Sequence, residues 1–288
     1  MLLIFLGCGF LKAKEPPGVE AHRMGTSMFP ENSASALNNA LELGWPAVEM
    51  DVLLTADGQV VVNHDPWLES PRCTHADGSA FSERLWIFEH SLADLKADVL
   101  CGGAVREEFP EAAVVAEPLQ SLQEVKAAVG DSDLQLHLDL KIQEGRTADA
   151  ATSAAALRAE MADFPNHWWV TGGTEEVVAA LDNEDPSMEI WLDWPPLPAD
   201  SDATGRVLAA LLELELGTGD PVAAARRSGA DGIGVPYQIL DLNTVEGADS
   251  AGILVQAWVI NGEVALERYC EWPVHSLISD YPQRAPCL

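Results

Sequence analysis

Two carboxylates stand one residue apart in an apolar run that predicts a β-strand. Glu49 and Asp51 are the only charged residues of Pro46–Leu54. On a strand this spacing points both side chains to one face. Two like charges on a packed face are costly unless a cation compensates them, and the hard ions Mg²⁺ and Ca²⁺ prefer oxygen ligands. The pair therefore predicts a divalent-metal site, with solvated acids at an exposed strand end as the alternative.

Histidines stand on both sides of this acidic pair in the sequence. His22-Arg23 closes one predicted strand, and His64-Asp65 follows the short run 60–63. Two imidazoles near a metal can supply the base and the acid that phosphate-ester cleavage needs near neutral pH. Arg23 can bind a phosphate through two parallel hydrogen bonds. The residue types favour phosphodiester hydrolysis, although the sequence does not say which histidine is the base and which is the acid.

Eight strand-like segments alternate with helical segments, which is typical of a parallel β/α fold. The strands are expected at Val19–Met24, Pro46–Leu54, Leu134–Lys141, His167–Gly172, Met188–Trp194, Ala230–Tyr237, Ile253–Asn261 and Ser276–Asp280. The helices are expected at Ser33–Leu43 with Asn32 as its cap, Leu122–Val129, Ala148–Ala162, Glu175–Leu181, Gly205–Leu216, Leu242–Ala248 and Glu263–Glu271. With 288 residues, 48% of them hydrophobic, the chain can bury one large core. The pattern predicts a single (β/α)₈ barrel domain over residues 15–288.

One long segment interrupts this alternation. Residues 63–118 contain Pro, Gly and polar residues and no convincing β/α unit. A stretch of this length is more typical of a functional insertion than of a plain loop. We expect an insertion at about residues 65–118, after the second strand and over the C-terminal mouth of the barrel, where such enzymes have their active sites.

The cysteines and the N-terminus bear on location. Apart from Cys8 there are four cysteines, and the local pairing joins Cys73 to Cys101 and Cys270 to Cys287, with four free thiols as the alternative.

Residues 1–14 are expected to be a leader or tether, because the opening MLLIFLGCGFL is too short to span a bilayer and resembles a secretory signal. The small residues before Cys8 resemble a lipoprotein cleavage site. We expect an extracytoplasmic protein, periplasmic or secreted, with lipid anchoring at Cys8 as one form and a cytoplasmic location still open.

The charge of the chain limits its partners. The formal net charge is −30. Such a surface repels nucleic-acid backbones and anionic membranes, so nucleic acid is not an expected partner. An anionic substrate must instead meet a locally positive centre, which a metal ion or a few well-placed cations can provide.

The order of these residues resembles the glycerophosphodiester phosphodiesterase family. The matching segments are His22-Arg23, Pro30-Glu31-Asn32-Ser33, Gly44, Glu49-Met50-Asp51-Val52, Thr55-Ala56-Asp57-Gly58 and His64-Asp65. Further matches are Leu138-Asp139-Leu140-Lys141, Ala257-Trp258-Val259-Ile260-Asn261 and Ile278-Ser279-Asp280-Tyr281-Pro282. The resemblance therefore runs from about residue 20 to residue 282.

The resemblance implies metal-dependent hydrolysis of a glycerophosphodiester to glycerol 3-phosphate and an alcohol. Asp139 would be the third metal ligand, and Lys141, on the same strand face, would hold a phosphate oxygen. Glu31 would support the metal or the substrate hydroxyls, with helix-start electrostatics as its alternative role. Trp258 would wall the glycerol pocket, or belong to the barrel core.

Two departures from the family pattern leave other functions open. Met24 stands where the family has glycine, so it is expected to narrow the mouth or shift the His22 loop, with Gly25 taking over the turn. His137 stands where relatives commonly have asparagine, and a hydrogen-bonded interior histidine is the favoured interpretation. The alternatives are a phospholipase D-type phosphodiesterase acting on lysophospholipid or sphingomyelin, and a non-catalytic barrel.

Overall fold

The computed structural model describes residues 17–195 and 219–288. The predicted helix Gly205–Leu216 and the predicted tether with Cys8 lie outside these residues. Within the described ranges, no helix is both long enough and apolar enough to cross a membrane.

Eight parallel strands form a closed barrel. They are β1 (Gly18–Ala21), β2 (Ala47–Leu54), β8 (Gln135–Leu140), β9 (Trp168–Gly172), β10 (Ile190–Asp193), β11 (Gly232–Pro236), β12 (Leu254–Trp258) and β13 (Ser276–Ser279). Each strand pairs with the next one of the barrel in the chain, and β1 closes the ring by pairing with both β13 and β2. The predicted barrel is confirmed, and each predicted strand overlaps one of these eight.

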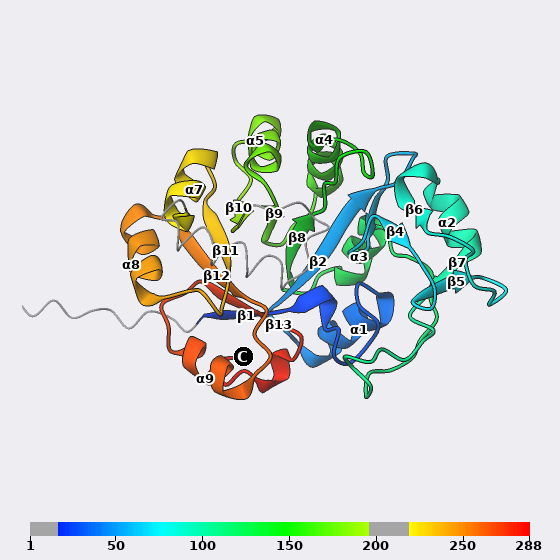
Figure 1. The fold of residues 1–288 in the computed structure, drawn as a ribbon, viewed down its shortest axis with the longest axis horizontal. Helices are drawn as coiled ribbons and strands as arrows, with labels where there is room; N and C mark the ends of the chain where they lie inside the picture. The colour runs from blue at the N-terminus through cyan, green and yellow to red at the C-terminus, as the bar shows by residue number, and fades with distance from the viewer. Residues whose placement is uncertain (1–16, 196–218) are drawn as a thin grey trace, which may run out of the picture.

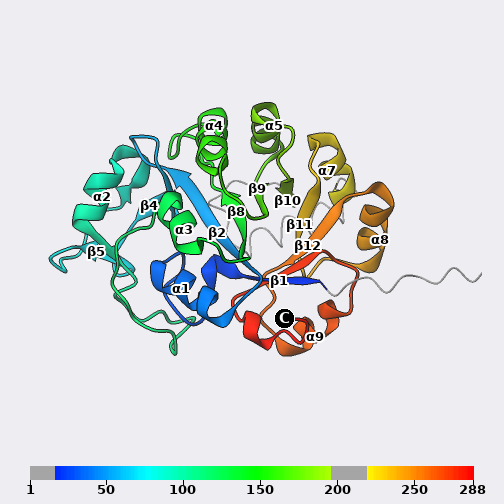
Figure 2. The same cartoon turned by 180° about the vertical axis from the view of Figure 1, so that it is seen from behind.

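Helices surround the strands (Figures 1 and 2). They are α1 (Ala34–Leu43), α3 (Leu122–Val129), α4 (Ala150–Met161), α5 (Glu175–Glu184), α7 (Pro221–Ser228), α8 (Leu242–Ala251) and α9 (Glu263–Cys270). Helix α7 was not among the predicted helices, although its signals are present. Pro221 is its first residue, the Asp220 side chain accepts from the N–H of Ala223, and Gly229 ends it at φ 80°.

The start of α1 differs from the prediction. Ser33, rather than Asn32, is the N-cap, and its side chain accepts a hydrogen bond from the N–H of Ala36. Asn32 has φ 55°, and its amide donates instead to Asp51 Oδ2 at 2.7 Å. The predicted cap is therefore wrong, because a contact with a buried carboxylate on β2 holds the asparagine side chain away from the helix.

The first strand is shorter than expected. It ends at Ala21, and residues 22–24 form a 3₁₀ turn in which Arg23 and Met24 have φ of 47° and 66°. Gly25 continues the turn at φ 105°, as predicted. Met24 is fully buried in the main core and does not line the pocket, so the expectation that it narrows the mouth is wrong.

The insertion has more regular structure than the sequence suggested. After β3 (Val60–Val62), which pairs antiparallel with β2, come the short pairs β4 (Trp67–Leu68) with β6 (Leu85–Trp86) and β5 (Cys73–His75) with β7 (Val99–Cys101), and the helix α2 (Leu92–Asp98). These elements lie beside β2, at one side of the barrel (Figure 1). They enclose a separate small apolar cluster that includes Leu68, Ile87 and Leu95.

Both predicted disulfides are present. Cys73 is bonded to Cys101 inside the insertion, across the register of β5 and β7. Cys270 at the end of α9 is bonded to Cys287. The free-thiol alternative is therefore wrong for these four cysteines.

The barrel interior changes from apolar to polar along the strands. Trp169 and Trp191 are packed with Ala47 in a small buried cluster. Gly232 leaves the space that Trp191 needs, since a Cβ there would lie 2.4 Å from the indole ring. Further along the same strands, the inward-facing positions carry polar and acidic side chains, and these form the floor and walls of a pocket.

Candidate active site

Three carboxylates converge where the middle of β2 lies beside the C-terminal end of β8. Glu49, Asp51 and Asp139 each offer an oxygen within 4.8 Å of the other two, and Asp51 and Asp139 are direct neighbours in the strand register. Oxygens that bind one ion at about 2.0–2.6 Å can be at most about 5 Å apart, so this spacing fits a single ion. The oxygen-only donor set fits a hard divalent cation. The structure thus brings together the three predicted metal ligands.

The acids repel one another in the absence of a cation. Glu49 and Asp51 are 3% and 1% exposed. Burial and the adjacent Asp51 charge raise the pKa of Glu49 to about 7. A divalent ion would favour the ionised form of this carboxyl group, so the electrostatics of the cluster also favour a cation.

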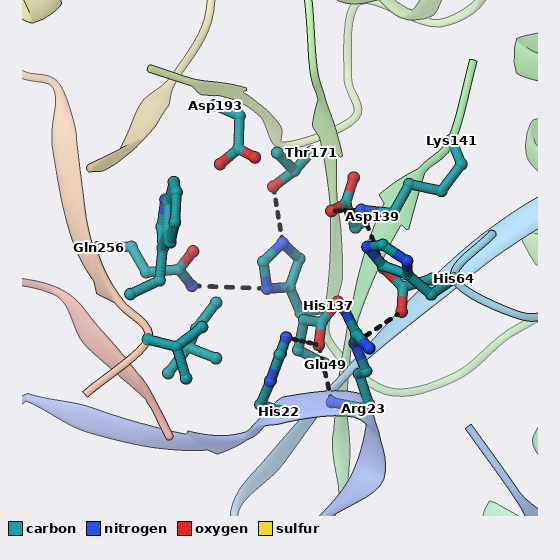
Figure 3. A pocket seen from close by; sticks show the side chains of 14 residues that line it. His22, Arg23, Glu49, His64, His137, Asp139, Lys141, Thr171, Asp193 and Gln256 are labelled. Carbon is teal, nitrogen blue, oxygen red and sulfur yellow. Dashed lines mark hydrogen bonds and ion pairs between the residues drawn. The ribbon is translucent and has the colours of Figure 1, made fainter. Parts of the chain in front are cut away.

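Lys141 lies against the same acids. Its Nζ is 2.9 Å from Asp51 Oδ1 and also pairs with Asp139 (Figure 3). Although burial opposes ionisation, Lys141, His64 and Arg23 together hold the pKa of Asp51 well below its usual range. Lys141 therefore lies beside the three-acid cluster and balances part of its negative charge.

His22 is oriented by a carboxylate from the last strand of the barrel. Its Nδ1 is 2.5 Å from Asp280 Oδ1, and Asp280 Oδ2 accepts from the amide of Asn261 at 2.6 Å. Burial opposes the charged imidazole, but the carboxylates of Asp280 and Glu49 together outweigh this effect and raise the pKa of His22. With Nδ1 donating to Asp280, Nε2 is left toward Glu49, whose Oε2 is 3.9 Å away.

His64 has a similar carboxylate partner but a different electrostatic setting. Its Nδ1 is 2.8 Å from Asp65 Oδ1. Burial and the positive charge of Arg23 lower the pKa of His64, despite the opposing effect of Asp51. The two histidines line the same pocket (Figure 3). Their pKa values are nevertheless shifted in opposite directions, upward for His22 and downward for His64.

Arg23 lies in the left-handed turn after β1, which directs both its backbone and its side chain to the site. Its N–H donates to Glu49 Oε2 at 2.8 Å, and its guanidinium contacts Glu31 at 2.8 Å and Asp51 at 3.5 Å. The atom nearest to Asp51 is Nε, which is buried and makes this ion pair but no hydrogen bond within the described ranges. Glu31 contacts Arg23 and Arg72 and does not contact the three-acid cluster. Its carboxylate therefore holds these two arginine side chains in place.

The floor and far wall of the pocket carry further polar groups. His137 is buried, with Nδ1 2.7 Å from Glu20 and Nε2 2.6 Å from Thr171, as predicted for a hydrogen-bonded interior histidine. It also lines the pocket, and Gln256 joins it by donating to Glu20 at 2.6 Å. Trp258 is among the residues that line the pocket, and Asp193 lies on the side away from His64 (Figure 3). The cavity measures about 290 Å³.

Several site residues were not predicted from the sequence. Asp65 and Asp280 belong to quoted motifs but had no assigned role, Asn32 was expected only as a helix cap, and Arg72 and Asp193 belong to no quoted motif. The adjacency of Asp65 to His64 could have signalled a pair. The contacts of Arg72 with Glu31 and of Asp280 with His22 could not be foreseen, because they join residues distant in the chain.

Comparisons with known proteins agree with this geometry. The model of the Glycerophosphoryl diester phosphodiesterase family matches residues 22–180. A Bacillus subtilis glycerophosphodiester phosphodiesterase is 23% identical over 267 residues, covering 91% of this chain and 83% of that protein. One from Caldanaerobacter subterraneus is 32% identical over 123 residues, covering 43% of this chain and 44% of that protein.

Solved structures share the fold. A Silicibacter pomeroyi protein superposes with a TM-score of 0.80 at 21% identity, covering 94% of this chain and 92% of its own. An Oleispira antarctica phosphodiesterase, solved with the product sn-glycerol 3-phosphate, gives a TM-score of 0.69 at 23% identity, covering 94% and 95%. Since the family model spans more than half of the chain and begins at the His22 identified above, the chain belongs to the glycerophosphoryl diester phosphodiesterase family.

Proposed function

We propose that this protein hydrolyses glycerophosphodiesters to glycerol 3-phosphate and an alcohol. The observation that carries the proposal is the three-acid cluster with His22, His64, Arg23 and Lys141 in one pocket. This set matches what phosphodiester cleavage requires, namely a positive centre for the phosphate and two proton-transfer groups. Family membership and the product bound to the Oleispira antarctica phosphodiesterase support the same substrate class.

Glu49, Asp51 and Asp139 would hold the divalent ion, Mg²⁺ or Ca²⁺. When bound, this ion supplies positive charge to the non-bridging phosphate oxygens. Arg23 and Lys141 add to that charge from either side of the cluster. The acids of this site would otherwise repel an anionic substrate, so the cations are needed for binding as well as for catalysis.

The two histidines transfer the protons. One accepts the proton of the attacking hydroxyl group, from water or from the glycerol of the substrate itself, and the other donates a proton to the oxygen of the departing alcohol. Asp280 and Asp65 hold Nδ1 of His22 and His64, so each imidazole keeps Nε2 for this exchange. Attack by the glycerol hydroxyl would give a cyclic phosphate, which water then opens.

Release of glycerol 3-phosphate from glycerophosphocholine, glycerophosphoethanolamine and glycerophosphoglycerol tests the proposal, with Mg²⁺, with Ca²⁺ and with EDTA. Substitution of His22 or His64 by Ala should lower kcat by about 10²–10⁴-fold. His167→Ala is the matched control, because that histidine is half exposed and pairs with Glu189 outside the pocket. Full activity of both His22→Ala and His64→Ala would reject the mechanism. Cleavage of sphingomyelin or lysophospholipid alone would favour the phospholipase D-type alternative, and no cleavage of any diester would favour a non-catalytic barrel.

We also propose an extracytoplasmic location. The two disulfides support it, because such bonds persist in oxidising compartments. Cell fractionation, followed by thiol alkylation with and without reduction, tests this location. Metabolic labelling with a fatty acid tests lipid attachment at Cys8.

A further inference from the structure

Arg72, which belongs to the insertion, contacts the carboxylates that pair with Arg23 and with His64. Arg72 Nη1 donates to Glu31 Oε1 at 2.8 Å, and its Nη2 donates to Asp65 Oδ2 at 2.9 Å. The second oxygen of each carboxylate contacts a residue that lines the pocket. Glu31 Oε2 accepts from Arg23 at 2.8 Å, and Asp65 Oδ1 is 2.8 Å from His64 Nδ1. One guanidinium thus connects the partners of the phosphate-binding arginine and of a proton-transfer histidine.

The backbone of Arg72 is fixed by the insertion. Its neighbour Cys73 is bonded to Cys101, and the N–H of Gly102 donates to the Arg72 carbonyl oxygen at 2.9 Å. Gly102 has φ 84°, and a Cβ there would lie 2.6 Å from Pro30. The disulfide-bonded part of the insertion therefore packs directly on the segment that carries Glu31.

The charges show why a cation is needed at this point. Glu31 and Asp65 repel each other, and burial also disfavours both charges. Arg23 and Arg72 nevertheless lower the pKa of Glu31 to about 2. His64 and Arg72 lower the pKa of Asp65. Removal of Arg72 leaves two partly buried carboxylates with one cationic or hydrogen-bonding partner each, which frees them to rotate.

We propose that Arg72 is a positioning residue for the reaction, acting through Asp65 on His64 and through Glu31 on Arg23. It does not line the pocket and contacts neither the three-acid cluster nor the expected phosphate position. The insertion would therefore contribute to catalysis, because it supplies the guanidinium that holds Glu31 and Asp65 in position. This inference rests on the proposed hydrolysis of glycerophosphodiesters.

Kinetics of Arg72→Ala, Arg72→Lys and a matched control test the inference. Arg72→Ala should lower kcat by about 10–100-fold, as loss of an orienting partner does at other catalytic sites. Arg72→Lys should recover only part of the loss, because one ammonium cannot hold two carboxylates in a bidentate geometry. Arg84→Ala is the control. Arg84 belongs to the same insertion and pairs with Glu69 at 2.8 Å, but it is half exposed and lies outside the pocket.

A double-mutant cycle with Asp65→Asn separates positioning from general loss of stability. If Arg72 acts partly through Asp65, the loss of kcat in the double variant should be smaller than the product of the two single losses. Effects that multiply would overturn the inference, as would an Arg72→Ala enzyme with unchanged kcat and KM.

Binding of glycerol 3-phosphate, measured by calorimetry, gives a readout that does not need turnover. Arg72→Ala should weaken this binding by about 10-fold through the loosened Arg23, and equal affinity in wild type and variant would count against the inference. Weakened binding in Arg72→Ala together with a wild type that cleaves no diester would reject the proposed function alone.

Discussion

Asp280 Oδ1 lies 2.5 Å from Nδ1 of His22, although the two residues are separated by 258 positions in the chain. The closure of the barrel brings them together, because β1 pairs with β13 and Ala21 is in register with Ser279. His22 and Asn261 keep the pKa of Asp280 below its usual range against the effect of burial, so the carboxylate is ionised and Nδ1 of His22 is its donor. Asp280 therefore fixes the tautomer of His22.

Asp280→Asn should shift the alkaline limb of the pH–rate profile. Burial lowers and Asp280 raises the pKa of His22, and the net shift is upward, so the imidazolium persists above pH 6.5 and is lost as pH rises through the folded-state pKa. Removing the Asp280 charge should lower this pKa and move the falling limb of kcat/KM to lower pH. A profile from pH 5 to 9 checks the shift. An unmoved limb would show that His22 does not act as the acid.

The acid limb should follow His64. Burial and Arg23 lower the pKa of this imidazole, so its neutral, base-competent form appears below pH 6.5 as pH rises. His64→Ala should remove the rising limb, and His22→Ala the falling limb, from the residual activity. If His64→Ala removed the falling limb and His22→Ala the rising limb, His22 would be the base and His64 the acid.

Metal binding should stabilise the protein. An ion at Glu49, Asp51 and Asp139 removes the repulsion among these acids and, at about 100 times its Kd, adds roughly 2.7 kcal/mol to the free energy of unfolding. Thermal unfolding with EDTA, Mg²⁺ and Ca²⁺ measures this effect. Asp139→Asn should lose most of the metal-dependent shift in Tm, whereas Asp163→Asn, an exposed acid paired with Lys126, should keep it. Equal shifts in both variants would place the ion elsewhere.

The two disulfides should differ in their effects on catalysis. Replacing both cysteines of either pair by serine should lower the free energy of unfolding by about 2–4 kcal/mol. Only Cys73→Ser with Cys101→Ser should also lower kcat, because this bond lies next to Arg72 and holds the insertion on the Glu31 segment. Cys270→Ser with Cys287→Ser is the control at the end of the chain. Equal kcat in the two double variants would separate the insertion from catalysis.

Met24→Gly should destabilise the protein without making it more active. Glycine relieves the left-handed φ of 66°, which is worth about 1–2 kcal/mol. Loss of the fully buried Met24 side chain costs about 2–5 kcal/mol, so the midpoints of the two ranges give a net loss of stability of roughly 2 kcal/mol. Denaturant unfolding and kcat/KM for glycerophosphocholine check both parts. A large gain in kcat/KM would restore the idea that Met24 restricts the mouth.

Much of the architecture follows from local sequence. The alternation of apolar strands and amphipathic helices placed all eight strands within a few residues, since side-chain periodicity is set by the backbone of each element. The i, i+2 spacing put Glu49 with Asp51 on one face of β2, and the family motifs added Asp139. The missed helix α7 and the shortened first strand show the limits of this reasoning. Helix α7 is short and has Val222 as its one large apolar residue, and the turn at Arg23 depends on its contact with Glu49.

The sequence by itself determined the barrel and the residue types of the site: three acids, two histidines, an arginine and a lysine. Only the tertiary structure decided how those groups are held. The pairing of His22 with Asp280 needs closure of the ring, and the contact of Arg72 with Glu31 needs the insertion to fold back on the loop after β1. Both are contacts between distant residues. Periodicity and motif spacing report only on neighbours along the chain, whereas such contacts depend on the packing of the whole domain.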